Sequence, residues 1–255
     1  MHGSTVVTHV AFIPARSGST RLSDKNMMDF CGTPLATLSV VQALAIESFD
    51  EVVFSTDSEL YIDNLVSDLN LRGIDDSRLG IHRRSEVHSS ATSKIFDVIR
   101  DLYGVERQSP NETDLVTLLL PTAPLRSRNT VERVVEAATQ TGEDVFTCCK
   151  FDFHVNFAFS IESGRKGWTT LLSSNPMLTG ITRSQDQKEY WHPHGGAVTL
   201  WTHRLTPDRV SLYSGAMPFE TSRLEALDID TFDDITLTRS VARALQSDAP
   251  FWNIP

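Results

Sequence analysis

The sequence predicts an α/β fold in which a mostly parallel sheet is flanked by helices. Short apolar runs of strand length alternate along the chain with segments whose apolar residues recur at helical spacing. The run 114–120 is almost continuously apolar, which is typical of a central strand buried on both faces. With 255 residues and 40% hydrophobic content, the chain can bury a sizeable core. We therefore expect a single domain over residues 1–255, with an inserted segment at about 150–195 where the alternation weakens.

The expected elements follow this alternation in order. Apolar runs predict strands at residues 6–12, 51–59, near 81, 114–120 and 143–150. Helical spacing predicts helices at residues 34–46, 59–71, 95–103, 131–138 and 232–245. Polar residues at the end of the run 51–59 can cap the helix that follows. Between residues 151 and 161 phenylalanines alternate with mostly polar residues, which predicts a strand with one covered face.

Composition and charge exclude several classes of function. The net charge is -10 and there are no basic runs, so we expect no nucleic-acid partner. No apolar run reaches membrane-spanning length and the first residues lack a secretory pattern, so we expect a cytoplasmic protein without a membrane partner. Cys31, Cys148 and Cys149 lack metal-type spacing and are expected to be reduced and buried.

The stretch Ile13–Asn26 joins the first strand to the first helix and is locally cationic within an acidic chain. Its small residues let backbone amides approach a ligand closely, as phosphate-binding loops require. Three cations and a neutral amide donor could hold a small polyanion such as a nucleoside triphosphate. The alternative is an ordinary solvated loop. The candidate binding residues are Ala15, Arg16, Ser17, Gly18, Arg21, Lys25 and Asn26.

A pair of carboxylates near the C-terminus could hold a metal ion. If the segment is a strand, Asp228 and Asp230 point to the same face and the apolar Ile229 points to the other. Two carboxylates on one face repel unless a cation lies between them, and hard oxygen ligands favour Mg²⁺ or Mn²⁺. Asp233 and Asp234 are better explained as acidic residues at a helix N-terminus, and the same explanation is the alternative for Asp230.

Two other features have competing explanations. Asp57 follows a strand end, where ligands bind in a parallel sheet, but it could equally cap the next helix. His192 and His194 are two residues apart, a spacing that could bind zinc. Because no third ligand is evident nearby, we do not expect a metal there.

The stretch Ile13–Asn26 resembles the pattern I-P-A-R-G-G-S-K-R-x-P-x-K-N, which is followed by G-x-P-L, here Gly32-Thr33-Pro34-Leu35. These are signatures of the cytidylyltransferases that activate sialic acid and related nine-carbon sugar acids. Further similar segments are S-T-D-S-E, R-P-A-E-L with a Ser/Thr-rich turn, Q-P-T-S-P-L-R, R-S-Q-D…Y-H-x-x-G and S-I-D-I-D-T. They occur in chain order from about Ala11 to Leu245, and Phe30-Cys31-Gly32 is similar to the pseudaminic acid branch.

The resemblance implies a Rossmann-like nucleotide-diphospho-sugar transferase fold and transfer of CMP from CTP to an acidic sugar, with release of pyrophosphate. Arg16, Lys25, Asp228 and Asp230 would be the catalytic residues, the two aspartates holding Mg²⁺ or Mn²⁺. Arg83 and Ser93 would contact the cytosine ring, although without the resemblance Arg83 would be taken for a surface residue. The acceptor would be bound by residues at the positions of Leu120, Thr122, Arg183, Gln185 and His192. The inserted segment would cover the acceptor pocket and mediate a homodimer.

Two departures from the family pattern leave the acceptor open. Leu120 replaces a glutamine that contacts the sugar acid, and Thr20 replaces the usual lysine of the first loop. An isobutyl group cannot make the hydrogen bonds of an amide, so the acceptor need not be ordinary sialic acid. One alternative is cytidylylation of a small phosphonate. A second alternative is a non-catalytic nucleotide-binding protein on the same scaffold.

Overall fold

A seven-stranded sheet forms the centre of the molecule, seen in a computed structural model that describes residues 8–18, 22–90, 92–105, 114–161, 168–170 and 172–246. Its strands are β1 (His9–Pro14), β4 (Glu51–Thr56), β5 (Leu79–Arg83), β6 (Leu115–Leu118), β7 (Val145–Lys150), β10 (Trp191–Trp201) and β11 (Met217–Glu220). Their order is β11-β7-β10-β6-β1-β4-β5. Strand β10 runs antiparallel to β6 and β7, whereas the other neighbours pair in parallel. The expected mostly parallel α/β architecture is confirmed.

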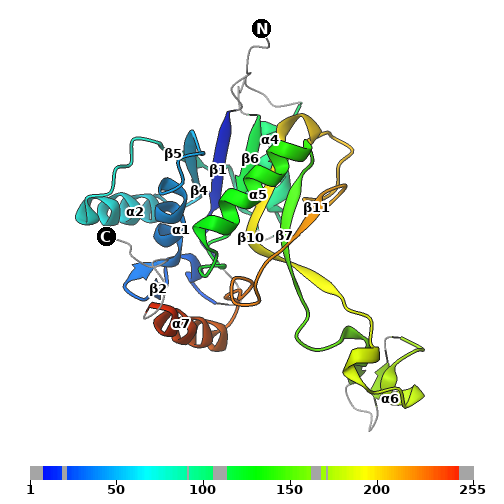
Figure 1. Ribbon diagram of the computed structural model, residues 1–255. Helices are drawn as coiled ribbons and strands as arrows, with labels where there is room; N and C mark the ends of the chain where they lie inside the picture. The colour runs from blue at the N-terminus through cyan, green and yellow to red at the C-terminus, as the bar shows by residue number, and fades with distance from the viewer. Residues whose placement is uncertain are drawn as a thin grey trace.

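Helices cover both faces of this sheet (Figure 1). The longer ones are α1 (Leu35–Leu44), α2 (Glu59–Arg72), α4 (Ile95–Tyr103), α5 (Arg128–Thr141) and α7 (Phe232–Gln246). The shorter ones are α3 (Glu86–Ser89), α6 (Pro176–Thr179) and the 3-10 turns η1 (Lys25–Met27), η2 (Val155–Phe157), η3 (Ser184–Asp186) and η4 (Thr202–Arg204). Ser58 caps α2, as the polar residues at the end of the run 51–59 led us to expect, and Ser127 caps α5. Left-handed Gly73 and Gly142 end these two helices. Among the described residues, no helix is long and apolar enough to cross a membrane.

Strand β1 is buried on both faces. Ala11 and Ile13 pack in the core formed with α1, α2 and α5, whereas Val10 and Phe12 pack in the core formed with α4. Alternate residues of a strand point to opposite faces, so its apolar run serves both cores. The loop that follows β1 therefore starts from a rigid base.

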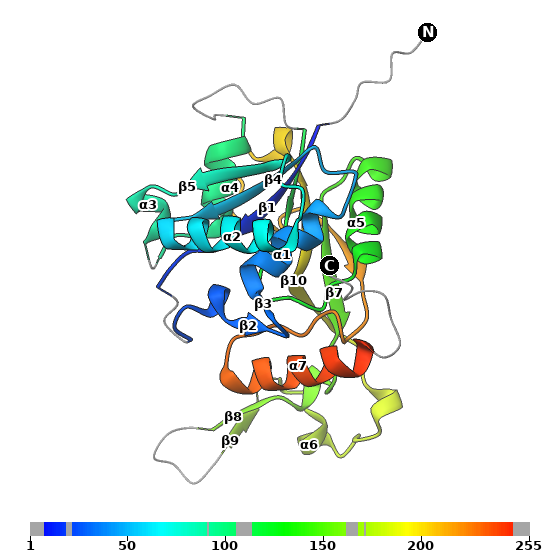
Figure 2. The same cartoon turned by 90° about the vertical axis from the view of Figure 1, so that its left-hand side faces the viewer.

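A third apolar cluster packs the hairpin after the N-terminal loop against the segment around the start of α7. Phe30 lies in the hairpin β2 (Asp29–Phe30) and β3 (Thr33–Pro34), and it belongs to the same buried cluster as Ile229 and Ile235. Figure 2 shows α7 lying beside this hairpin. Packing of this cluster places the segment before α7 next to the N-terminal loop.

Residues between β7 and β10 leave the sheet and form an arm (Figure 1). It holds η2, α6, η3 and a small hairpin of β8 (Phe159–Ile161) and β9 (Trp168–Thr170). The expected strand over 151–161 is wrong except at Phe159–Ile161, because the chain forms the turn η2 in between. The structure covers neither Phe153 nor Ile161, which are 67% and 76% exposed.

Candidate functional site

The N-terminal loop begins at the carboxyl end of β1, at the edge of the parallel sheet where ligands bind. The Ala15 amide donates to the Ser55 carbonyl at 2.8 Å, so the loop stays attached to β4 as it leaves the strand. Gly18 has a positive φ of 73°, a conformation that glycine adopts without strain. Arg21 lies outside the described residues, so its predicted role is not addressed by the structure.

Asp57 braces this loop. Its carboxylate accepts hydrogen bonds from the Ser17 amide at 2.7 Å and the Ser17 hydroxyl at 3.1 Å. Ser58 instead caps α2 by accepting from the Tyr61 amide. Of the two explanations for Asp57, the position beside the loop is therefore the correct one.

Lys25 and Asp230 meet although 205 positions separate them in the chain. The Lys25 ammonium lies 2.9 Å from Asp230 Oδ1, with side chains 14% and 32% exposed. Asn26 donates its amide to the Arg16 carbonyl at 3.0 Å and thus links Lys25 to the start of the loop. The cationic loop and the C-terminal carboxylates converge on one place, as the sequence led us to expect.

The segment Asp228–Asp230 is not a strand, contrary to our expectation. It runs as an irregular segment held by the Ile229 amide, which donates to the Thr122 carbonyl at 2.9 Å, and by the buried Ile229 side chain. Ile229 is thus buried between two more accessible aspartates even without a sheet. The aspartates remain neighbours because this one residue anchors them.

The surroundings of the two aspartates favour bound positive charge. Burial raises the pKa of Asp228, the negative charge of Asp230 adds to this rise, and the Thr122 hydroxyl and Lys25 oppose it. Asp234 accepts from the amides of Asp230 and Thr231 at 3.0 and 2.7 Å, which confirms its place at the start of α7. The Asp230 side chain points to Lys25 rather than to the helix end.

Two carboxylates are the metal-ligand set that this region offers. In the part of the chain that the structure describes, no group of three or more His, Cys, Asp or Glu residues could hold a metal ion. Mg²⁺ commonly binds through one or two carboxylates together with substrate phosphates and water. Asp228 and Asp230 fit that pattern because each offers a carboxylate and the charge of Asp230 acts on Asp228.

Adjacent arginines at the end of β5 have different surroundings. Arg83 pairs with Glu59 at 2.6 Å, and both side chains are more than 60% exposed. Arg84 turns inward, where its Nε donates to Ser55 Oγ at 2.9 Å, and Ser55 Oγ is also 2.9 Å from His82 Nδ1. The Arg84 Nη2 atom is buried without a hydrogen-bond partner among the described residues.

Arg84 is a functional candidate that sequence reasoning missed. Burial lowers the pKa of Arg84 to about 10, opposed by nearby Asp57 and aided by nearby Arg16. Arg16 donates to the Ser90 carbonyl at 2.7 Å, and the Ser93 amide bonds the same carbonyl at 3.1 Å. The alternation of side chains along a strand was the available signal, since two successive arginines must point to opposite sides.

The predicted acceptor residues fall into two groups. Leu120 and Thr122 follow β6 near the aspartates, and the Leu120 amide donates to the Gly195 carbonyl at 3.2 Å. Arg183 and Gln185 lie in the arm near η3, where the Gln185 amide oxygen can accept from Arg183 Nη2 at 2.7 Å. Figure 1 shows that the arm, which also carries α6, projects from the end of the sheet.

Histidines at the base of the arm make local contacts. His192 Nε2 lies 3.2 Å from Cys149 Sγ, and its ring packs against Phe151. His194 is buried and bonds Thr221 Oγ1 at 2.8 Å, and burial lowers its pKa to about 4. His194 is therefore a neutral core histidine at physiological pH.

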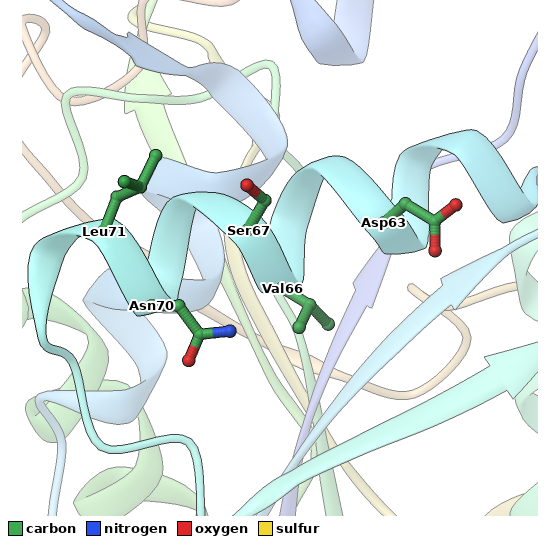
Figure 3. A pocket seen from close by; sticks show the side chains of 5 residues that line it. All are labelled: Asp63, Val66, Ser67, Asn70 and Leu71. Carbon is green, nitrogen blue, oxygen red and sulfur yellow. The ribbon is translucent and has the colours of Figure 1, made fainter.

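A shallow hollow on α2 is a poor alternative site (Figure 3). It is lined by Asp63, Val66, Ser67, Asn70 and Leu71. These side chains include a carboxylate and no cation, so they do not suit a polyphosphate. The loop after β1 remains the better candidate.

Comparisons with known proteins agree with this geometry. A family model described as cytidylyltransferase matches residues 10–234. The CMP-N,N'-diacetyllegionaminic acid synthase of Legionella pneumophila is 29% identical, over 91% of this chain and 95% of that protein. A pseudaminic acid cytidylyltransferase of Campylobacter jejuni is 28% identical, over 91% and 94% of the two chains.

Solved structures share the fold at lower identity. CMP:2-keto-3-deoxy-manno-octonic acid synthetase complexed with CTP has a TM-score of 0.60 at 17% identity, covering 93% of this chain and 99% of that one. A 4-diphosphocytidyl-2C-methyl-D-erythritol synthase from Anaerococcus prevotii has a TM-score of 0.61 at 11% identity, with the same coverage. The strand order and the convergence of the loop and carboxylates agree with these comparisons. Because the family model matches most of its length, the chain belongs to the cytidylyltransferase family.

Proposed function

We propose that this enzyme transfers CMP from CTP to a nonulosonic sugar acid of the legionaminic or pseudaminic type, with release of pyrophosphate. The observation that carries the proposal is the 2.9 Å contact between Lys25 and Asp230, which joins a cationic loop to a carboxylate pair. The relatives over nearly the full chain are named for acids of this type, which supports the choice of acceptor.

In this proposal the N-terminal loop holds the triphosphate. Arg16 and Lys25 neutralise the phosphate oxygens, and the amides near Gly18 donate to them. Asn26 keeps the loop in shape through the Arg16 carbonyl. An acceptor hydroxyl attacks the α-phosphate in line, and pyrophosphate leaves with its charge stabilised by these cations.

Asp228 and Asp230 are the residues that would hold Mg²⁺ or Mn²⁺. When bound, such an ion lowers the pKa of the attacking hydroxyl and offsets phosphate charge. The Thr122 carbonyl accepts from the Ile229 amide at 2.9 Å and so fixes the backbone between the two aspartates. Burial and the neighbouring charge of Asp230 raise the pKa of Asp228, and a divalent cation between two such carboxylates would offset their repulsion.

We also propose that two copies of the chain associate through the arm. Apolar side chains exposed on the arm are Phe151, Phe153, Phe159, Ile161, Leu172, Met177, Leu178 and Ile181. An exposed apolar set of this size is typical of a protein interface. Light scattering after size exclusion would test this: a monomer that turns over normally would refute it.

We assign the reaction to the cytoplasm, where CTP is made. The free thiols of Cys31, Cys148 and Cys149 suit a reducing compartment.

The test of function is pyrophosphate release from CTP and Mg²⁺ with a panel of acids. Legionaminic, pseudaminic and sialic acids form one arm, and small phosphonates form the other. Turnover with a nonulosonic acid alone supports the proposal, and turnover with a phosphonate alone refutes it. CTP binding without pyrophosphate release from any acid would instead indicate a non-catalytic nucleotide-binding protein.

A further inference from the structure

A bulge interrupts β10 between the sheet and the arm. The pairing of β10 with β7 shifts register between Pro193 and Val198. The Thr147 side chain takes the place of the backbone hydrogen bonds that are lost at this shift. Its Oγ1 lies 3.1 Å from the carbonyls of His194 and Ala197 and accepts from the Ala197 amide at 3.1 Å. Bulges redirect a strand and are held only where the surroundings satisfy their backbone groups.

Arg126 holds the same bulge from the other side. It is 3% exposed and lies on the loop between β6 and α5. Its donors reach the carbonyls of Leu120 (2.8 Å), Gly196 (3.3 Å) and Gly195 (3.5 Å) and the side-chain oxygens of Gln42 and Ser39. Burial lowers the pKa of Arg126 to about 9, so the guanidinium stays mostly charged at neutral pH. A planar guanidinium can reach this many acceptors at once, whereas an ammonium cannot.

The loop and the bulge are also in direct contact. The Leu120 amide donates to the Gly195 carbonyl, and a methyl group added at Gly195 would lie 2.7 Å from Leu120 Cδ1. The absence of a side chain at Gly195 leaves room for Leu120 in its present position. Two residues beyond Leu120, Thr122 holds the Ile229 amide through its carbonyl and Asp228 through its hydroxyl.

A continuous set of contacts thus runs from the arm to the carboxylate pair. The base of the arm is fixed by the bulge, and the bulge by Arg126 and Thr147. The loop of Arg126 also carries Thr122, whose carbonyl accepts from the Ile229 amide between the two aspartates at 2.9 Å. We propose that Arg126 and Thr147 are positioning residues that fix the acceptor-binding arm relative to Asp228 and Asp230. This inference depends on the proposed function, because it assumes that the arm contacts the acceptor.

The variants that test it separate positioning from stability. Thr147→Val removes the hydroxyl and keeps the shape, and Thr147→Ser restores the hydroxyl. Arg126→Lys keeps the charge but cannot reach all the carbonyls. The matched control is Arg209→Lys, because Arg209 is a buried arginine paired with Asp144 just before the opposite end of β7.

Steady-state kinetics with each substrate varied, together with CTP binding by calorimetry, give the main readout. A displacement near 1 Å at the arm predicts that kcat/KM for the acceptor falls by about 100-fold in Thr147→Val and Arg126→Lys. The affinity for CTP should change by less than about twofold, since neither residue touches the N-terminal loop. Thr147→Ser should behave like the wild type, and Arg209→Lys should lose stability with both kinetic constants unchanged. Equal losses for CTP and acceptor, or no loss in Thr147→Val, would overturn the proposal.

Amide hydrogen exchange supplies a readout that does not need turnover. In Thr147→Val we expect faster exchange at the Leu120 and Ile229 amides, with exchange at Ala15 unchanged. Unchanged exchange at Ile229 would show that the bulge and the carboxylates are not coupled. If the wild type turns over no acid, the proposed function fails, whereas the exchange result still decides whether the coupling exists. If Arg126→Lys does not fold, Thr147→Val decides the outcome alone.

Discussion

Asp230→Asn is the most direct test of the site. The substitution keeps the shape of the side chain but removes one of two carboxylates and the partner of Lys25. At an effective dielectric constant near 20, two unit charges 2.9 Å apart attract by about 6 kcal/mol. Partial exposure of both side chains, desolvation and lost side-chain entropy reduce the measured net value to about 1 kcal/mol. The free energy of unfolding should therefore fall only slightly.

Activity should respond far more strongly than stability. Loss of a metal ligand removes several kcal/mol of stabilisation from the charge that develops in the transition state, so turnover should fall by more than about 100-fold. The Mg²⁺ concentration that gives half-maximal rate should rise as well, because one anionic ligand is gone. Removing the negative charge should also lower the pKa of Asp228, since Asp230 helps to raise it.

The assay is pyrophosphate release at saturating CTP across a Mg²⁺ titration, beside urea unfolding of the same samples. Asp233→Asn is the matched control, because it makes the same charge change at an exposed position of α7. Wild-type activity and wild-type Mg²⁺ dependence in Asp230→Asn would refute the metal assignment. An equal loss in Asp233→Asn would show that net charge alone is responsible.

Three further predictions address the nucleotide site and the core. Arg16→Ala should raise the KM for CTP and lower turnover, so that kcat/KM falls by about tenfold or more, because a charge-assisted phosphate contact is lost. Unchanged kinetics would show that the loop does not hold phosphate. Arg84→Ala should reduce the preference for CTP over UTP by about tenfold, measured as a ratio of kcat/KM values, because its inward guanidinium can donate to the acceptor edge of cytosine. If Arg84→Ala keeps the preference for CTP over UTP and Arg83→Ala loses it, the base contact belongs to Arg83, as the sequence predicted. Burial lowers the pKa of His9 from 6.5 to about 4. As the pH falls, His9 therefore binds its proton in the unfolded state at a higher pH than in the folded state. The free energy of unfolding should accordingly decrease between about pH 6.5 and pH 4. The loss should approach about 3 kcal/mol by chemical denaturation, and a His9→Gln variant with the same acid slope would contradict this cause.

The fold was accessible from the sequence because its strands and helices are strongly patterned. The apolar run before Pro121 became β6, and the spaced apolar residues after Arg126 became α5. The strand expected from the alternating phenylalanines of the arm is mostly wrong, because such alternation predicts a strand only where another element covers one of its faces. Phe153 is 67% exposed and packs against Phe157 of the turn η2, so among the described residues its ring does not lie on a covered strand face.

The site was predicted less completely than the fold. Lys25 and Asp230 could be placed in one site because the family resemblance assigns both to the catalytic residues. Alternation along the chain indicates that Arg83 and Arg84 point to opposite sides. No local pattern shows which of the two points inward. The role of Arg126 was also hidden, since its acceptors are mostly backbone carbonyls of β10 and the loop, brought close by the fold.

The internal partners of the loop explain how an acidic chain can hold a phosphate-binding site. Asp57 accepts from the Ser17 amide and hydroxyl, and Asp230 pairs with Lys25, so carboxylates occupy the donors proposed to bind phosphate. A triphosphate carries more charge than a carboxylate and forms stronger hydrogen bonds to the same donors. Asp230 has a second role in the proposed complex, because a divalent cation can replace Lys25 as its partner while Lys25 turns to phosphate. Binding of CTP and of the metal ion should therefore reinforce each other, since each supplies the partner that the other displaces.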